Sequence, residues 1–150
     1  MNKPSIIVHM MTPVDGRIDC EMTAQLAGEP EYYSTLDSLN VPTRISGRVT
    51  AETELTRGGK FNSQNKEILG KTDFAKNATA DNYNIVVDTK GTLQWGTENG
   101  NNFPHLIITS EQVTKDYLDR QNISWIAAGK DQIDLAKAME ILADELTLIV

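Results

Sequence analysis

Hydroxyl-bearing, glycine and cationic residues recur where strands are predicted to end. Three predicted strands end at Met11-Thr12, Thr109-Ser110 and Ala128-Gly129-Lys130, and Arg48 stands at the start of a predicted helix. The carboxyl ends of parallel strands collect ligands, and helix N-termini at the same edge offer unpaired N–H groups and a positive dipole. Arg48 and Lys130 would add full positive charges. The pattern predicts a site for an anionic nucleotide.

Other arrangements that carry chemistry do not fit this chain. Residues 56–61 lack the first glycine of a phosphate loop and the hydroxyl residue that follows its lysine, and no Gly-x-Gly-x-x-Gly follows the first predicted strand. His9 and His105 are far apart in the sequence, and each falls in or beside an apolar strand, which favours packed or capping histidines over metal ligands. No Ser, His and Asp set has the setting of a nucleophile elbow. We predict no metal site and assign no catalytic residue.

The second half of the sequence predicts the elements that position these residues. A short strand covers residues 84–88, and an edge strand follows at 91–95. Three strands then alternate with two helices, in the order 105–109, 111–120, 123–128, 133–146 and 148–150. Apolar side chains at three- and four-residue spacing give the second helix one apolar face. Strands joined by crossover helices run parallel, so the sequence predicts an α/β fold.

The first half is less regular. Residues 5–11 form an almost continuous apolar run, which predicts a strand buried in the sheet, and Asp15-Gly16 predicts a turn after it. A helix is possible around residues 22–26, whereas Pro30 and the polar residues after it argue against a long helix. A helix is expected to begin near Gly47. The long polar stretch 56–84 is typical of a functional loop, an insertion or a mobile lid.

Length and composition limit the classes of function. A chain of 150 residues predicts a single domain, 1–150. Its net charge is -7 and no basic face stands out in the sequence, which argues against binding to nucleic acid or to an anionic membrane. The single Cys20 excludes an internal disulfide. No apolar run reaches spanning length, and the N-terminus lacks a secretory signal. We therefore expect a cytoplasmic protein.

Two segments resemble a known family. Residues 6–18, Ile-Ile-Val-His-Met-Met-Thr-Pro-Val-Asp-Gly-Arg-Ile, resemble the opening strand and S-x-D-G-R turn of the reductase domain of riboflavin biosynthesis. Residues 47–52, Gly-Arg-Val-Thr-Ala-Glu, resemble the G-R-x-T-x-E element which that domain shares with dihydrofolate reductases. The resemblance implies a dihydrofolate reductase-like fold with a mostly parallel central sheet flanked by helices. It also implies an NADPH-dependent oxidoreductase of the phosphoribosylaminouracil reductase type, which transfers hydride to the ribosylamine of a phosphoribosylaminopyrimidine.

The resemblance also implies roles for individual residues. Thr12 would lie near the nicotinamide, and Thr89 is a further cofactor candidate. Asp15 and Glu52 are expected as substrate-side or structural carboxylates. The phosphates of NADPH would lie against Gly47, Arg48 and Thr50, and its 2'-phosphate would be flanked by Thr109, Ser110 and Lys130.

Each of these residues also has a structural alternative. Asp15 with Gly16 can serve a turn alone, Thr50 and Ser110 can cap helices, and Arg48 and Lys130 can be solvated surface charges.

The chain departs from the family pattern at two places. Pro13 stands where the family usually has Ser, and the sequence ends at Val150, before the Gly-rich loop and final strands that family members carry. We therefore expect an incomplete sheet whose exposed edge favours a homodimer. Two other functions stay open: a non-catalytic nucleotide-binding or structural remnant of the fold, and a reductase of the same fold for another heterocycle.

Overall fold

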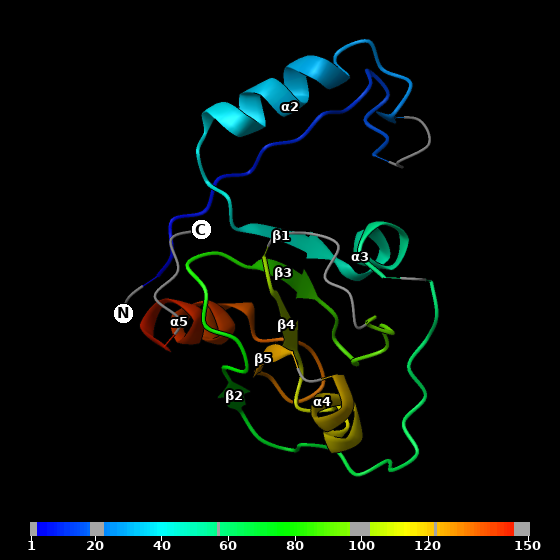
Figure 1. The fold of residues 1–150 in the computed structure, drawn as a ribbon, viewed down its shortest axis with the longest axis vertical. Coiled ribbons are helices and arrows are strands. Elements are labelled where there is room, and N and C mark those ends of the chain that lie inside the picture. The colour runs from blue at the N-terminus through cyan, green and yellow to red at the C-terminus, as the bar shows by residue number, and fades with distance from the viewer. Residues whose placement is uncertain (1–2, 19–22, 57, 97–102, 122, 146–150) are drawn as a thin grey trace. The chain divides into compact units, whose positions relative to one another are not determined.

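Short apolar segments pair into one central sheet in this protein, which we describe from a computed structural model (Figure 1). The structure describes residues 3–18, 23–56, 58–96, 103–121 and 123–145. The strands follow the spatial order β1-β3-β4-β5-β2. Their bounds are Arg44–Gly47 for β1, Asp73–Ala75 for β2, Asn84–Val87 for β3, His105–Thr109 for β4 and Ser124–Ala127 for β5.

Four of these strands run parallel and end together. Gly47 pairs with Val87, Val87 with Ile108, and Ile108 with Ile126, so β1, β3, β4 and β5 reach one edge of the sheet in register. Only β2 is antiparallel, and it pairs with β5. The structure thus confirms the predicted α/β class with a mostly parallel sheet.

Helices cover the sheet and bury its apolar side chains. Because side chains alternate along a strand, Val86, Ile107 and Ala127 share one face. They form a core cluster with side chains of the two short helices and the segments beside them. The helices are α3 (Arg48–Glu54), α4 (Lys115–Gln121) and α5 (Leu135–Glu145), and α5 packs against β5.

Side-chain caps determine where α4 and α5 begin. Thr114 Oγ1 accepts a hydrogen bond from the backbone N–H of Tyr117 at 3.2 Å, so α4 starts at Lys115 and not at the predicted residue 111. Asp134 accepts from the N–H of Lys137 at 3.0 Å and begins α5 in the same way. The predicted strand 148–150 lies outside the described residues.

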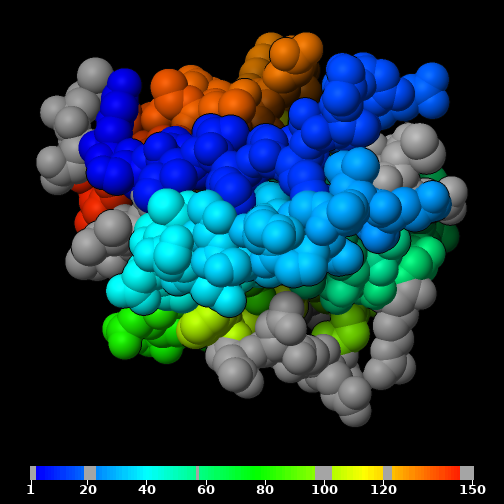
Figure 2. All heavy atoms as spheres, turned by 90° about the horizontal axis from the view of Figure 1, so that it is seen from above, coloured from blue at the N-terminus to red at the C-terminus, as the bar shows by residue number. Residues whose placement is uncertain are grey.

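Residues 5–42 form a compact unit separate from the sheet unit, which begins at Thr43. Its helix α2 (Glu29–Ser38) lies beside the N-terminal segment, and Figure 2 shows the two side by side in cyan and dark blue. His9 stacks on Tyr32 with ring centroids 4.6 Å apart. The predicted helix around residues 22–26 falls partly outside the described residues. The expectation of a single domain stays a prediction.

Two expectations for this first unit are wrong. Residues 5–11 form no strand, and Val8 is 82% exposed. An apolar run has strand propensity, but a strand exists only where another strand pairs with its backbone. The expectation that Pro30 opposes a long helix is also wrong, because Pro30 stands in the first turn of α2, where its missing N–H costs nothing.

Segments outside the sheet differ from the sequence expectations as well. Residues 91–95 form no strand of the sheet; Leu93 makes only an isolated bridge with Lys60. The polar stretch after α3 is fastened at several points, since Phe61 N–H donates to Thr92 O at 2.9 Å and Leu69 N–H donates to Val113 O at 2.8 Å. The stretch also contains β2, so it is not irregular throughout, while the functional-loop, insertion and lid interpretations stay predictions.

The core cluster predicts a matched pair of stability changes. Ile107→Ala removes buried methyl groups from the middle of β4, where Ile107 is fully buried, and should cost about 2–5 kcal/mol of unfolding free energy. Ile45→Ala makes the same chemical change on β1, where the side chain is 42% exposed, and should cost less than half as much. Urea denaturation measures both. Equal losses would contradict the assignment of the core.

Candidate functional site

The carboxyl edge of the parallel strands begins with a cation and a carboxylate on neighbouring strands. Gly47 and Val87 are paired, so the next residues, Arg48 and Asp88, leave the sheet side by side at the ends of β1 and β3. Arg48 opens α3 and remains partly exposed, whereas Asp88 is only 1% exposed. The edge therefore has an accessible positive charge over a buried negative one.

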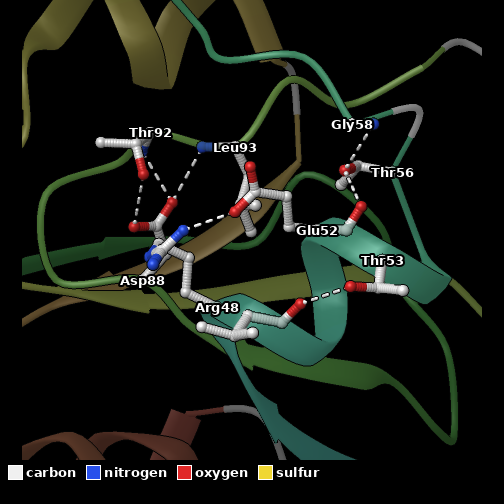
Figure 3. A network of polar contacts seen from close by, with 9 residues as sticks. Arg48, Glu52, Thr53, Thr56, Gly58, Asp88, Thr92 and Leu93 are labelled. Atoms are coloured by element: carbon white, nitrogen blue, oxygen red, sulfur yellow. Dashed lines mark hydrogen bonds and ion pairs between the residues drawn. The ribbon is translucent and has the colours of Figure 1, made fainter. Parts of the chain in front are cut away.

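Backbone and hydroxyl donors compensate the buried charge of Asp88 (Figure 3). Its Oδ2 accepts from the backbone N–H groups of Thr92 at 2.7 Å and Leu93 at 3.0 Å, and its Oδ1 accepts from Thr92 Oγ1 at 3.3 Å. The chain reverses between these partners at Gly91, which has φ +63°. Asp88 thus holds the loop that follows β3.

The loops after β3 and β4 meet at one carbonyl. Thr89 O accepts from Thr109 Oγ1 at 3.1 Å, from Ser110 Oγ at 2.7 Å and from Ser110 N–H at 3.2 Å. Both hydroxyl residues are fully buried. In this arrangement their hydroxyl hydrogens are used inside the protein, and the two side chains position Thr89.

A tight turn after β5 completes the edge. Gly129 has φ +91°, and a Cβ at that position would stand 2.1 Å from the backbone oxygen of Gln132. The backbone oxygen of Gly129 accepts a hydrogen bond from the N–H of Glu111 at 2.9 Å, and that of Lys130 accepts one from Nε2 of Gln112 at 3.0 Å. The loops after β4 and β5 are therefore joined, with the side chain of Lys130 exposed on their surface.

Arg48 is held by an ion pair within its own helix. Its Nη1 lies 2.6 Å from Glu52 Oε2, and the two side chains are 40% and 29% exposed. A guanidinium has five N–H donors, so this pair leaves others for a second anion. Glu52, expected as a substrate-side or structural carboxylate, here positions Arg48 (Figure 3).

Thr50 does not cap α3. It is the third residue of that helix, whose N-cap is Gly47 with extended backbone, so the capping alternative for Thr50 is wrong. Ser110 lies outside α4, which Thr114 caps, so the same alternative fails for Ser110.

Thr12 and Asp15 belong to the other unit of the chain. Gly16 N–H donates to Pro13 O at 2.9 Å, which confirms the predicted turn, and Asp15 accepts from Arg17 N–H at 3.2 Å. Both Thr12 and Asp15 are exposed. The sheet unit itself brings the remaining sequence candidates to its carboxyl edge and to α3: Gly47, Arg48, Thr50, Glu52, Thr89, Thr109, Ser110 and Lys130.

Sequence reasoning missed the central role of Asp88. An aspartate directly after a buried strand, followed by Lys90-Gly91, is the pattern of a side chain that accepts from the backbone of the turn after it. The sequence contains this pattern, but it does not show that the side chain of Asp88 is buried.

Comparison with known proteins adds no assignment. Family models, curated proteins and solved structures were each searched, and none matches this chain. No group of three or more His, Cys, Asp or Glu side chains in the described part could hold a metal ion. Of the described helices, none combines the length and the apolar character that crossing a membrane requires.

The edge can bind an anion without metal ligands of its own. Arg48 opens α3, where Glu52 pairs with it, and Lys130 stands on a loop whose backbone accepts from Gln112, so both donors are attached to segments that are held in place and little order has to be gained on binding. No exposed carboxylate other than that of Glu52 forms a described ion pair with Arg48. This electrostatic arrangement favours a phosphate-bearing ligand over a cation.

The turn at Gly129 gives a prediction about the integrity of the edge. Gly129→Ala would force a Cβ into backbone atoms at a positive φ and should cost about 3 kcal/mol or more of unfolding free energy. Gly70→Ala is the matched control, because Gly70 has φ +71° with nothing within 4 Å of the added Cβ, and should cost about 1 kcal/mol. Chemical denaturation compares them, and equal losses would contradict the packed turn.

Proposed function

We propose that this protein binds NADPH at the carboxyl edge of its parallel sheet and acts as a reductase of the phosphoribosylaminouracil reductase type. The observation that carries the proposal is the register of β1, β3, β4 and β5, which ends four strands at one edge beside Arg48 and Lys130. Ligands of open parallel sheets bind outside such an edge. The two motifs at residues 6–18 and 47–52 support the dihydrofolate reductase-like fold and the reductase activity.

The residues at the edge fit a phosphate-rich cofactor in different ways. Arg48 and Lys130 would bind its phosphates directly, because their charged groups are accessible. Thr109 and Ser110 would act indirectly, because their hydroxyl hydrogens are donated to Thr89. We therefore place them as positioning residues and not, as the family resemblance implied, beside the 2'-phosphate.

The chemistry itself would come from the cofactor. When bound, NADPH supplies the hydride, while the protein binds, orients and shields its two ligands. Glu52 would hold the guanidinium of Arg48 at the strand end, and Asp88 would hold the loop that carries Thr89. The protein would then need no catalytic triad.

Cofactor binding is tested by calorimetric titration of NADPH and NADH into the protein. Arg48→Ala removes a charge-assisted contact worth about 1.5–3 kcal/mol, which corresponds to a loss of NADPH affinity of roughly tenfold to a hundredfold. Arg44→Ala is the control, because it removes the same charge at the opposite end of β1, and its affinity should change less than threefold. Equal losses in the two variants, or no binding by the folded protein, would overturn the site.

The preference for the phosphorylated cofactor has its own test. Lys130→Ala should weaken NADPH more than NADH, because only NADPH carries the extra phosphate that an exposed ammonium would meet. Lys137→Ala, on α5 beside Glu140, should weaken both equally and only slightly. Hydride transfer to a phosphoribosylaminopyrimidine is then followed by loss of NADPH absorbance. Binding without turnover would favour the non-catalytic alternative, and turnover of another heterocycle would favour the other reductase.

A further inference from the structure

A buried histidine lies at the opposite end of the sheet from the proposed site. His105 is the first residue of β4 and is 6% exposed. Its ring is tilted by 36° against the indole of Trp95, with the centroids 4.5 Å apart. Trp95 is itself 7% exposed. The neutral imidazole therefore forms part of the core.

Among the described residues, no hydrogen-bond acceptor contacts Nδ1 of His105. Its Nδ1 is buried without a hydrogen-bond partner, and so is Nδ2 of Asn84. These two residues are register partners on adjacent parallel strands, so their side chains share one row of one face. In the described part of the chain, an imidazolium at this position would carry an Nδ1–H without an acceptor and would have no carboxylate paired with it. Burial accordingly lowers the pKa of His105 below its ordinary value of 6.5.

The described charged and titratable groups on this face do not compensate a charge at His105. Arg44 shares the row on β1, and its positive charge would oppose protonation. Asp88 stands at the far end of β3 and is bound to the loop after it. On α4, burial and the charge of Asp88 raise the pKa of Tyr117, so its phenol stays neutral.

Trp95 connects His105 to α4 and to the loop after β3. Its Nε1–H donates to the hydroxyl of Tyr117 at 2.9 Å. Two residues earlier, Leu93 N–H donates to the carboxylate of Asp88. Residues 93–95 thus lie between a carboxylate at one end and the His105 ring at the other. Trp95 lies outside the strands of the sheet, so the sheet's own hydrogen bonds do not depend on its position.

We propose that His105 and Trp95 form a pH-sensitive latch, in which protonation of His105 releases the side chain of Trp95 from the core while the sheet stays folded and Leu93 stays bound to Asp88. The latch is closed when Trp95 is packed in the core. Above pH 6.5, the ordinary pKa of histidine, neutral His105 fully stabilises this closed form. As the pH falls from 6.5 through the lower pKa of His105 in the closed form, that stabilisation is lost. Acid therefore opens the latch and base closes it.

The fluorescence of Trp95 tests the latch. Trp125→Phe leaves Trp95 as the single tryptophan, since the chain has two. Between about pH 8 and pH 5 we expect its emission to shift to the red and its quenching by acrylamide to rise several-fold, with a midpoint below 6.5 and an unchanged far-UV circular dichroism spectrum. Loss of the circular dichroism signal at the same midpoint, or no change in Trp95, would overturn the proposal.

Three further variants assign the transition. His105→Gln should abolish it, whereas His9→Gln, which removes the only other histidine, should leave it unchanged. Asn84→Asp places a carboxylate beside His105 and should keep Trp95 in the core throughout the same pH range. A transition that persists in His105→Gln or disappears in His9→Gln would overturn the assignment.

A measurement on the unsubstituted chain covers the case in which His105→Gln does not fold. Nuclear magnetic resonance should show the imidazole of His105 titrating at the same pH at which the indole N–H of Trp95 loses its protection from solvent exchange. Two different midpoints would contradict the latch.

Discussion

The hydrogen bonds around Asp88 are the interaction on which the arrangement of this protein depends. A carboxylate that is 1% exposed requires donors, because an uncompensated charge in the core would be too costly to bury. Thr92 and Leu93 supply them from the backbone, and this closes the loop after β3. The closed loop presents Thr89 O to Thr109 and Ser110, which joins the loop to the end of β4. The edge of the sheet is thus held by buried polar contacts.

The same loop also organises the apolar core. After Leu93 the chain carries Trp95 across the face formed by Val86 and Ile107, where its indole meets Tyr117 and His105. One end of the sheet therefore has compensated polar groups beside an accessible cation, and the other end has a buried imidazole and amide without partners. The two proposals follow this division: we place the ligand at the edge whose buried polar groups are hydrogen-bonded, and the response to protonation at the end whose polar groups lack partners.

Much of the sheet could be predicted from local patterns. The strands at residues 84–88, 105–109 and 123–128 are confirmed within a residue or two, because each is a short run of Ile, Val or Ala that is buried on both faces. The register ends these strands at one edge, as predicted, which places Thr109 there, whereas Thr12 of the same predicted set belongs to the other unit. The same reasoning predicted a strand at residues 5–11, where none forms, because strand propensity does not supply a neighbouring strand to pair with.

The sequence by itself determined the class of the fold, three of the four parallel strands and the helix that begins after Gly47, because these depend on periodicity and on nearest neighbours; β1 was not predicted as a strand. Only the tertiary structure decided which polar groups are available. Thr109 and Ser110 have the chemistry of ligand donors, yet their hydrogens are donated to Thr89, a residue about twenty positions away. Asp88 has the chemistry of a surface carboxylate, yet it is buried. Hydrogen bonds between two loops set the first outcome, and the packing of the fold around the loop after β3 sets the second, so the types of the residues alone contain neither.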